Sequence, residues 1–184
     1  MAILFVILAI VVLLALYVMA QYNGLVKLRN RIENGWAQID VQLKRRYDLI
    51  PNLIETVKGY AAHEKSTLDA VIQARNAAMN ASGGVAGQAV AENGLSGTLK
   101  SLFALSEAYP DLKANQNFLN LQEELTSTED KIAYSRQYYN DEVRTYNTKT
   151  QTFPSSLIAG QFGFKQREYF QIDEGSKGPV NVKF

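Results

Sequence analysis

The sequence predicts an all-α protein in which a single N-terminal transmembrane helix continues into an elongated antiparallel three- to four-helix bundle. Residues 2–20 are nineteen consecutive apolar positions, and the first charged side chain is Lys27. From Leu25 onward, apolar residues recur every three or four positions, which is the period of an α-helix. From Phe118 to Phe153, a second apolar series recurs every seven positions on one helix face. We therefore expect an anchor at 1–21, a helical domain at 22–164 and a tail at 165–184.

The composition excludes several classes of function. A formal net charge of +1 on 184 residues argues against a general nucleic-acid binder, because such domains carry a large basic excess. The chain has no cysteine, which excludes disulfides, thiol nucleophiles and cysteine-ligated metal centres. The paired glycines Gly83 and Gly84 are not followed by the Lys-Ser/Thr of a phosphate-binding loop.

The apolar segment is long enough to cross a bilayer. Its nineteen residues would span about 28 Å as a helix, close to the ~30 Å hydrocarbon core. Thirteen of them are Ile, Leu, Val or Phe, whose insertion energies sum to roughly −4 to −8 kcal/mol. A cleaved signal peptide is the alternative, because Val18-Met19-Ala20 resembles a cleavage site. Against it, no Lys or Arg precedes the apolar run, and the run is longer than a signal-peptide core.

Basic residues follow the apolar segment, and none precedes it. Lys27, Arg29 and Arg31 would lie about 10–17 Å beyond Ala20 on a continuous helix, within reach of lipid headgroups. The positive-inside rule then places the N-terminus outside and the helical domain in the cytoplasm. We expect these three side chains to contact the headgroups of the lipid bilayer.

The first helical pattern continues as far as Val71, and Pro51 lies inside it. Because the apolar register survives across the proline, we expect a kink or a one-turn break near 48–51, not a domain boundary. Residues 81–97 are rich in glycine and alanine and contain no large apolar cluster, so they predict a mobile surface loop. A shorter helix is expected over 98–109, ended by Pro110.

A second long helix is predicted at about 115–151. Its seven-residue series consists of Phe118, Leu125, Ile132, Tyr139, Tyr146 and Phe153. The accompanying heptad positions are mostly polar, so packing against the first helix is more favourable than an isolated two-stranded coiled coil. Pro154 ends this helix, and 155–160 could form one further turn. Weak alternation at 169–174 and 180–184 is compatible with a short strand or a docked extended tail.

A basic triplet at 44–46 lies too far along the chain for lipid contact. Arg46 is twenty-six residues beyond Ala20, about 39 Å along a helix, whereas the Debye length is only ~8 Å. Glu129 and Arg136 lie seven residues apart and share a helix face. We predict an inter-helix polar network of Arg46, Glu129 and Arg136. The alternative is a set of solvated surface charges that contribute little individually.

Two Tyr-Asn pairs lie seven residues apart, at Tyr139-Asn140 and Tyr146-Asn147. They could form a ladder that docks a partner protein, because tyrosine supplies a broad amphipathic contact area. The favoured alternative is that the tyrosines fill the helix seam with their hydroxyls reaching water, while the asparagines lie beside it.

His63 is the only histidine. With Glu64 it begins an H-E-x-x-H pattern, but Thr67 stands where the second histidine is needed. Catalytic zinc sites use three protein ligands and an open position, which one histidine with scattered carboxylates rarely supplies. A hydrolase using His63 and Glu64 is therefore the least favoured function, and we expect no catalytic, cofactor or metal site.

Several short runs of sequence resemble those of a known bacterial family. The longest is DVQLKRRYDLIPNL at 40–53, and others are VKGYA at 57–61 and YPDLKA at 109–114. The Tyr-Asn pairs near 139 and 146 complete the set. Over about 22–164 the chain resembles the LemA family. The resemblance implies a single N-terminal anchor in the bacterial inner membrane and a cytoplasmic helical domain, and it implies no established activity.

The resemblance also implies that the partners of the protein lie at the membrane. Relatives in the magnetosome membrane, and frequent genomic company with membrane-bound zinc metalloproteases, imply membrane organisation or a stress function. We therefore expect a non-enzymatic scaffold or adaptor, with a homo-oligomer left open. The alternatives are an accessory subunit of a membrane zinc metalloprotease and a periplasm-facing adaptor of reverse topology.

Overall fold

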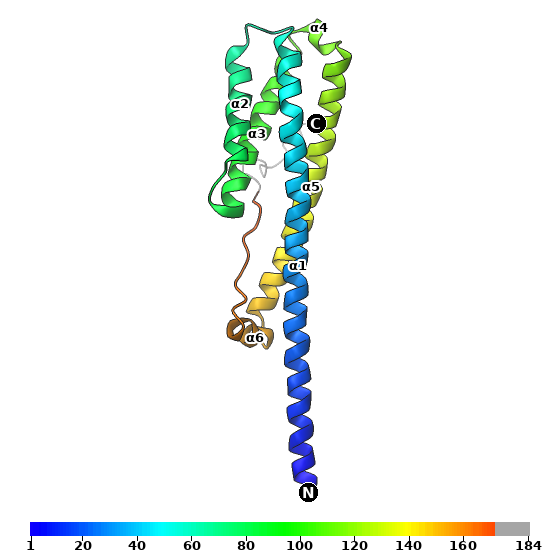
Figure 1. Cartoon of the computed structure of the whole chain (residues 1–184), viewed down its shortest axis with the longest axis vertical. Helices are drawn as coiled ribbons and strands as arrows, with labels where there is room; N and C mark the ends of the chain where they lie inside the picture. Colours follow the sequence, from blue (N-terminus) through cyan, green and yellow to red (C-terminus); the bar gives the residue numbers. More distant parts are fainter. Residues whose placement is uncertain (172–184) are drawn as a thin grey trace, which may run out of the picture. The chain divides into compact units, whose positions relative to one another are not determined.

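A computed structural model describes residues 1–171 of the chain. Every regular element within this range is a helix (Figure 1). The helices are α1 (Ala2–Lys58), α2 (Lys65–Met79), α3 (Gly84–Ser106), α4 (Pro110–Lys113), α5 (Gln116–Gln151) and α6 (Ser155–Gln161). The predicted all-α fold is confirmed for the described residues. Residues 164–171 have no regular secondary structure, and the predictions made for 172–174 and 180–184 lie outside the described range.

The chain divides into two compact units. We call residues 1–38 with 135–168 the anchor unit, and residues 39–134 with 169–171 the bundle unit. Both α1 and α5 contribute one segment to each unit. The anchor unit also contains α6, and the bundle unit also contains α2, α3 and α4.

The first part of α1 is apolar and exposed on every side from residue 2 to residue 20. Among the described residues, α1 is the one helix long and apolar enough to cross a membrane, as predicted. After this segment the apolar residues face inward, and Leu25 and Ile32 are buried. Within the anchor unit α1 runs antiparallel to α5, since Gly24 lies against Lys149 and Gly35 against Tyr138.

Pro51 does not interrupt α1, so of the two outcomes predicted near 48–51, a kink or a one-turn break, the break is wrong. The helix ends at Lys58 instead, and a turn over 59–64 leads into α2. Proline has no N–H, so the carbonyl of Tyr47, four residues earlier, loses its helical partner. Arg75 of α2 replaces that partner, because its Nε donates to the Tyr47 carbonyl at 2.8 Å. This side-chain bond compensates for the lost backbone bond.

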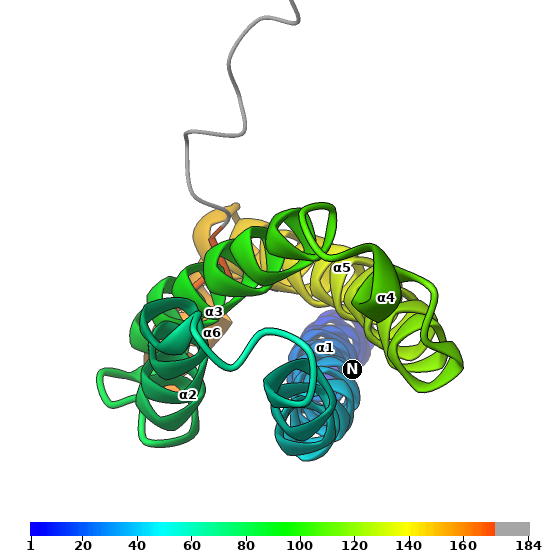
Figure 2. The same ribbon diagram turned by 90° about the horizontal axis from the view of Figure 1, so that it is seen from above.

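The glycine-rich segment 81–97 is not the loop that the sequence predicted. Residues 84–106 form α3, and the helix expected at 98–109 is its second half. Figure 2 shows α3 alongside α2 in the bundle unit. Leu95, Leu99 and Leu102 of α3 are buried in the core. Each interior glycine costs about 1 kcal/mol relative to alanine, but each buried leucine contributes roughly 1.5–3 kcal/mol. Tertiary burial therefore outweighs the poor local propensity.

Helix α5 follows its prediction closely, with bounds of Gln116–Gln151. Asn115 caps its first turn, because its Oδ1 accepts a hydrogen bond from the Phe118 N–H at 3.0 Å. The seven-residue series is buried from Phe118 to Tyr146. Its last predicted member, Phe153, lies beyond the end of the helix and is 80% exposed, so the periodicity no longer applies there. The further turn expected at 155–160 is present as α6.

Candidate functional site

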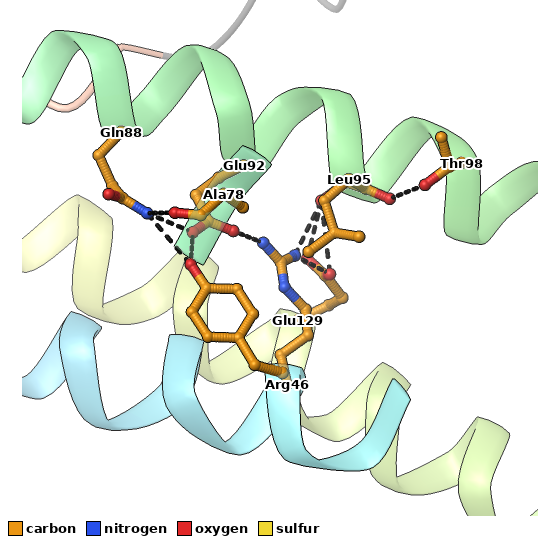
Figure 3. Close-up of polar contacts among 9 residues, drawn as sticks. Arg46, Ala78, Gln88, Glu92, Leu95, Thr98 and Glu129 are labelled. Atoms are coloured by element: carbon orange, nitrogen blue, oxygen red, sulfur yellow. Dashed lines mark hydrogen bonds and ion pairs between the residues drawn. The ribbon is translucent and has the colours of Figure 1, made fainter. Parts of the chain in front are cut away.

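The bundle unit contains a cluster of charged and polar side chains, which we call the Arg46 cluster (Figure 3). Its members come from three helices: Arg46 and Tyr47 from α1; Gln88, Glu92 and Ser96 from α3; and Glu129 from α5. The cluster therefore joins segments that are far apart in the sequence.

Arg46 is the centre of the cluster, and its side chain is only 1% exposed. Its Nη2 donates to the carboxylate of Glu92, which is also buried. Its Nη1 donates to Glu129 and, at 2.9 Å, to the hydroxyl of Ser96. Buried charges are stable in proteins when they are paired and hydrogen-bonded. One guanidinium thus links α1 to both α3 and α5.

Tyr47 and Gln88 complete the hydrogen bonds of Glu92. The Tyr47 hydroxyl donates to Oε1 of Glu92, and Gln88 Nε2 donates to the same oxygen at 2.6 Å. Gln88 also donates to the carbonyl of Ala78 at the end of α2, at 3.0 Å. Burial, and then the hydrogen bond to the Glu92 carboxylate, raise the pKa of Tyr47 well above its ordinary range. Tyr47 therefore stays protonated and acts as a donor.

The hydrogen bonds and ion pairs of the Arg46 cluster are suited to fixing the register of the helices that they join. Both carboxylate oxygens of Glu92 accept hydrogen bonds from this chain. Over residues 1–171, no group of three or more His, Asp or Glu side chains is placed to hold a metal ion. Because the bonds of Arg46 and Tyr47 cross from α1 to α3 and α5, the cluster sets how these three helices align.

The predicted pairing of Arg46 with Glu129 is confirmed. Arg136 belongs to the anchor unit, is half-buried and has an interaction of its own, so its membership of the network stays a prediction. Glu92 was not predicted as a member of the network, because residues 81–97 were predicted to form a loop. A signal was present, since Glu92 precedes Leu95 by three residues and Leu99 by seven, which is the phase of a buried helix face.

The Tyr-Asn pairs of α5 hold the segment that follows α6 in the anchor unit. The Tyr139 hydroxyl donates to the carbonyl of Glu168 at 3.0 Å. Asn147 engages both backbone groups of Arg167: its Nδ2 donates to the carbonyl, and its Oδ1 accepts from the N–H, each at 2.9 Å. An irregular segment is thereby fixed by hydrogen bonds that replace secondary structure.

This arrangement removes the Tyr-Asn ladder from the surface. Tyr139, Tyr146 and Asn147 are buried, and Asn140 is half-buried with an interaction of its own. The three buried side chains are not available to a partner, so the docking hypothesis is wrong for them. Burial supports the alternative that the tyrosines fill the seam, although the Tyr139 hydroxyl reaches a carbonyl and not water.

The three basic residues predicted to contact lipid lie on α1 in the anchor unit. Lys27 is exposed. The guanidinium of Arg29 lies 5.7 Å from the centre of the Phe164 ring, a cation–π distance. Arg31 Nη1 is 3.9 Å from a carboxylate oxygen of Glu142, a long ion pair in which Arg31 is mostly exposed and Glu142 is not. Contact between these side chains and lipid stays a prediction.

His63 is exposed in the turn that precedes α2. The neighbouring carboxylate of Glu64 accepts a hydrogen bond from the Tyr109 hydroxyl at 2.9 Å. That hydrogen bond is the main reason why the pKa of Tyr109 is raised. Glu64 therefore has a structural partner in the bundle unit.

Comparisons with known proteins give one family. Residues 35–184 match the sequence model of the LemA family. Magnetosome protein MamQ 2 of Paramagnetospirillum magneticum is 26% identical, over 95% of this chain and 73% of that protein. Magnetosome protein MamQ of Magnetospirillum gryphiswaldense is 25% identical, over 87% and 68%. Protein LemA of Metamycoplasma hominis is 28% identical, over 98% and 82%.

Proposed function

Because the chain belongs to the LemA family, and is a membrane-anchored helical protein, we propose that it is a scaffold or adaptor of the bacterial inner membrane. In this role it binds other proteins, or further copies of itself as a homo-oligomer, and carries out no catalysis. The helical domain supplies the binding surfaces, and α1 ties them to the bilayer.

The observation that carries this proposal is the contrast between the two parts of α1. Residues 2–20 are apolar and exposed on all sides, which is the surface that a lipid bilayer requires. The same helix then continues without a break into packed helices. Through this continuous helix, α1 would keep a bound protein close to the membrane.

The positions of charged residues support the orientation of the proposed scaffold. Lys27, Arg29 and Arg31 follow the apolar segment within eleven residues of Ala20. The positive-inside rule favours a cytoplasmic domain and an external N-terminus. A reporter enzyme that works only in the cytoplasm should therefore be active when it is fused to the C-terminus. A reporter that works only in the periplasm should be inactive there. Activity confined to a periplasm-dependent reporter would support the reverse topology instead.

Chemical crosslinking in native membranes, followed by mass spectrometry, tests the scaffold role. Lys58 and Lys113 lie in the bundle unit with half or more of each side chain exposed, so they are suitable reporters. We expect crosslinks from them to other proteins or, in isotopically mixed cells, to a second copy of the chain. Crosslinks confined to single chains would contradict the proposal.

The same experiment separates the alternatives. Reproducible crosslinks to one membrane zinc metalloprotease, with co-purification in detergent, would indicate an accessory subunit. A His63→Ala variant that folds and forms all crosslinks but fails to complement a deletion strain would favour an enzyme. A scaffold predicts normal complementation by that variant, because His63 has no part in the proposed function.

A further inference from the structure

Helix α6 and its flanking residues expose large apolar side chains in the anchor unit. Phe153 is 80% exposed, Leu157 66% and Phe162 53%; we call these three residues the α6 patch. The opposite side of α6 packs inward through Ile158 and Ala159. The helix therefore has one face buried in the protein and one apolar face that is largely exposed.

The α6 patch lies next to the point where α1 leaves its exposed apolar segment. The ring of Tyr22 is 5.0 Å from that of Phe162 and 5.5 Å from that of Phe164, each in an edge-on arrangement. Tyr22 follows Ala20, the last residue of the apolar run, by two positions, which is about 3 Å along the helix. Figure 1 shows α6 beside α1 at this height, with the N-terminal part of α1 projecting beyond it.

Basic groups lie at the same height. The ammonium group of Lys149, near the end of α5, occupies the space that a Cβ on Gly24 would fill. Lys27 is exposed three residues further along α1. Apolar and aromatic side chains flanked by cations are the composition of proteins that lie in the interfacial layer of anionic membranes.

We propose that the α6 patch inserts into the interfacial layer of the same bilayer that α1 crosses, as a second and peripheral membrane contact. This inference rests on the proposed membrane-spanning role of α1. Lipid is the occupant that the geometry favours, because the patch is continuous with the lipid-facing surface of α1 through Tyr22. Interfacial apolar side chains reach roughly 5–10 Å below the headgroups, which matches a helix held at the level of Tyr22.

The contact would give the anchor unit a fixed tilt. A single transmembrane helix rotates and tilts freely unless interfacial residues hold it. With α6 docked against the surface, one side of the anchor unit faces the membrane permanently. Bound partners would then approach from the remaining sides.

Depth-dependent quenching of tryptophan fluorescence tests the proposal on the full chain in liposomes. Trp36 is the only tryptophan, so Trp36→Phe gives a silent background. A tryptophan is then introduced by Leu157→Trp or, aromatic for aromatic at the most exposed position, by Phe153→Trp. We expect lipids brominated near the headgroup end of the acyl chain to quench either probe by roughly half, and lipids brominated near the bilayer centre to quench it less.

Two control variants give the quenching expected for a probe inside the bilayer and for a probe in water. Tyr17→Trp places the probe inside the apolar segment. Gln137→Trp places it on exposed α5 surface, about 21 Å along that helix from its end. Circular dichroism and thermal melting confirm that each variant folds.

The outcomes separate this inference from the proposed function. If the probe at residue 17 is quenched and the probes at 153 and 157 resemble that at 137, the α6 patch does not touch lipid and the inference is wrong. That result would point to a protein partner for the patch. If the probe at 17 is also unquenched, α1 does not span the bilayer and the proposed function itself fails.

Discussion

At the scale of single residues, a proline inside a long helix and an arginine on its neighbour form one structural unit. The carbonyl of Tyr47 has no backbone donor because Pro51 lacks an N–H, and Arg75 Nε fills the vacancy at 2.8 Å. This explains why α1 continues to Lys58, although prolines in helix interiors usually cause a kink or a break.

The pairing of Arg75 with Pro51 predicts a specific coupling. Arg75→Met should lower the free energy of unfolding by about 1–3 kcal/mol, because it leaves a partly buried carbonyl without a donor. In a Pro51→Ala background the restored N–H serves that carbonyl, so the same substitution should cost clearly less. Urea denaturation of the four proteins gives the interaction energy. Equal effects in both backgrounds would show that Arg75 acts elsewhere.

Neighbouring arginines of α1 should differ sharply in their contribution to stability. Arg46→Met leaves the buried Glu92 carboxylate unpaired and should destabilise the bundle unit by about 3–5 kcal/mol. Arg45→Met is the control: it breaks an ion pair with Glu124 in which both side chains are about half exposed. Such surface pairs contribute about 0–1 kcal/mol. Similar losses for the two variants, measured by urea denaturation, would contradict the burial argument.

The raised pKa of Tyr47 predicts that the protein loses stability at alkaline pH. Its folded-state pKa lies above the unfolded value of 10.0, so its contribution to stability is complete below pH 10. The contribution is lost as pH rises above 10 towards the folded value, because the unfolded chain releases the proton first. Tyr47→Phe should therefore flatten the decline of the melting temperature between about pH 9.5 and 11. Tyr134→Phe, at a 74% exposed position, is the control.

At the scale of elements, α3 shows how glycines can lie in a helix without defining a loop. Gly94 and Gly97 lie beside open space, since a Cβ added to either residue would meet no atom within 4 Å. Gly87 differs, since a Cβ there would collide with the carbonyl oxygen of Ser82. The turn before α3 also needs glycine, because Gly83 has a φ of +96°.

This difference between the glycines gives opposite predictions for one kind of substitution. Gly94→Ala and Gly97→Ala should each raise the free energy of unfolding by about 0.5–1 kcal/mol, because alanine restricts the unfolded chain and favours the helix. Gly87→Ala should lower it, because the Ser82 carbonyl has to move. Thermal and urea denaturation of the three variants measure the signs. Destabilisation by alanine at 94 and 97 would contradict this argument from helix propensity and open space.

At the scale of the whole molecule, the apolar segment of α1 determines where the protein resides. Two arginines near the centre of the span should cost roughly 5–7 kcal/mol, which is comparable to the total insertion energy. The double variant Val11→Arg/Leu14→Arg should therefore leave the membrane fraction after carbonate extraction, whereas Gln21→Arg, at the end of the span, should remain. Retention of the double variant would show that other parts of the chain suffice for anchoring.

The sequence alone determined the features that depend on neighbouring residues. The apolar span at 2–20 follows from the summed hydrophobicity of consecutive side chains, and α5 follows from a seven-residue series ended by Pro154. Neither inference requires knowledge of a distant contact. The pairing of Arg46 with Glu129 was predicted on other grounds, because Arg46 lies too far along the chain for lipid contact and Glu129 lies on a helix expected to pack against it.

Only the tertiary structure decided the features that depend on distant partners. Helix α3 forms because its leucines find a core built by other helices, a gain that no local propensity registers. Glu92 joins the Arg46 cluster for the same reason. Asn147 binds the backbone of Arg167, twenty residues away in a segment without regular structure and hence without a periodic signal. Burial and hydrogen bonding across the fold assigned these residues, because both depend on which chain segments meet in space.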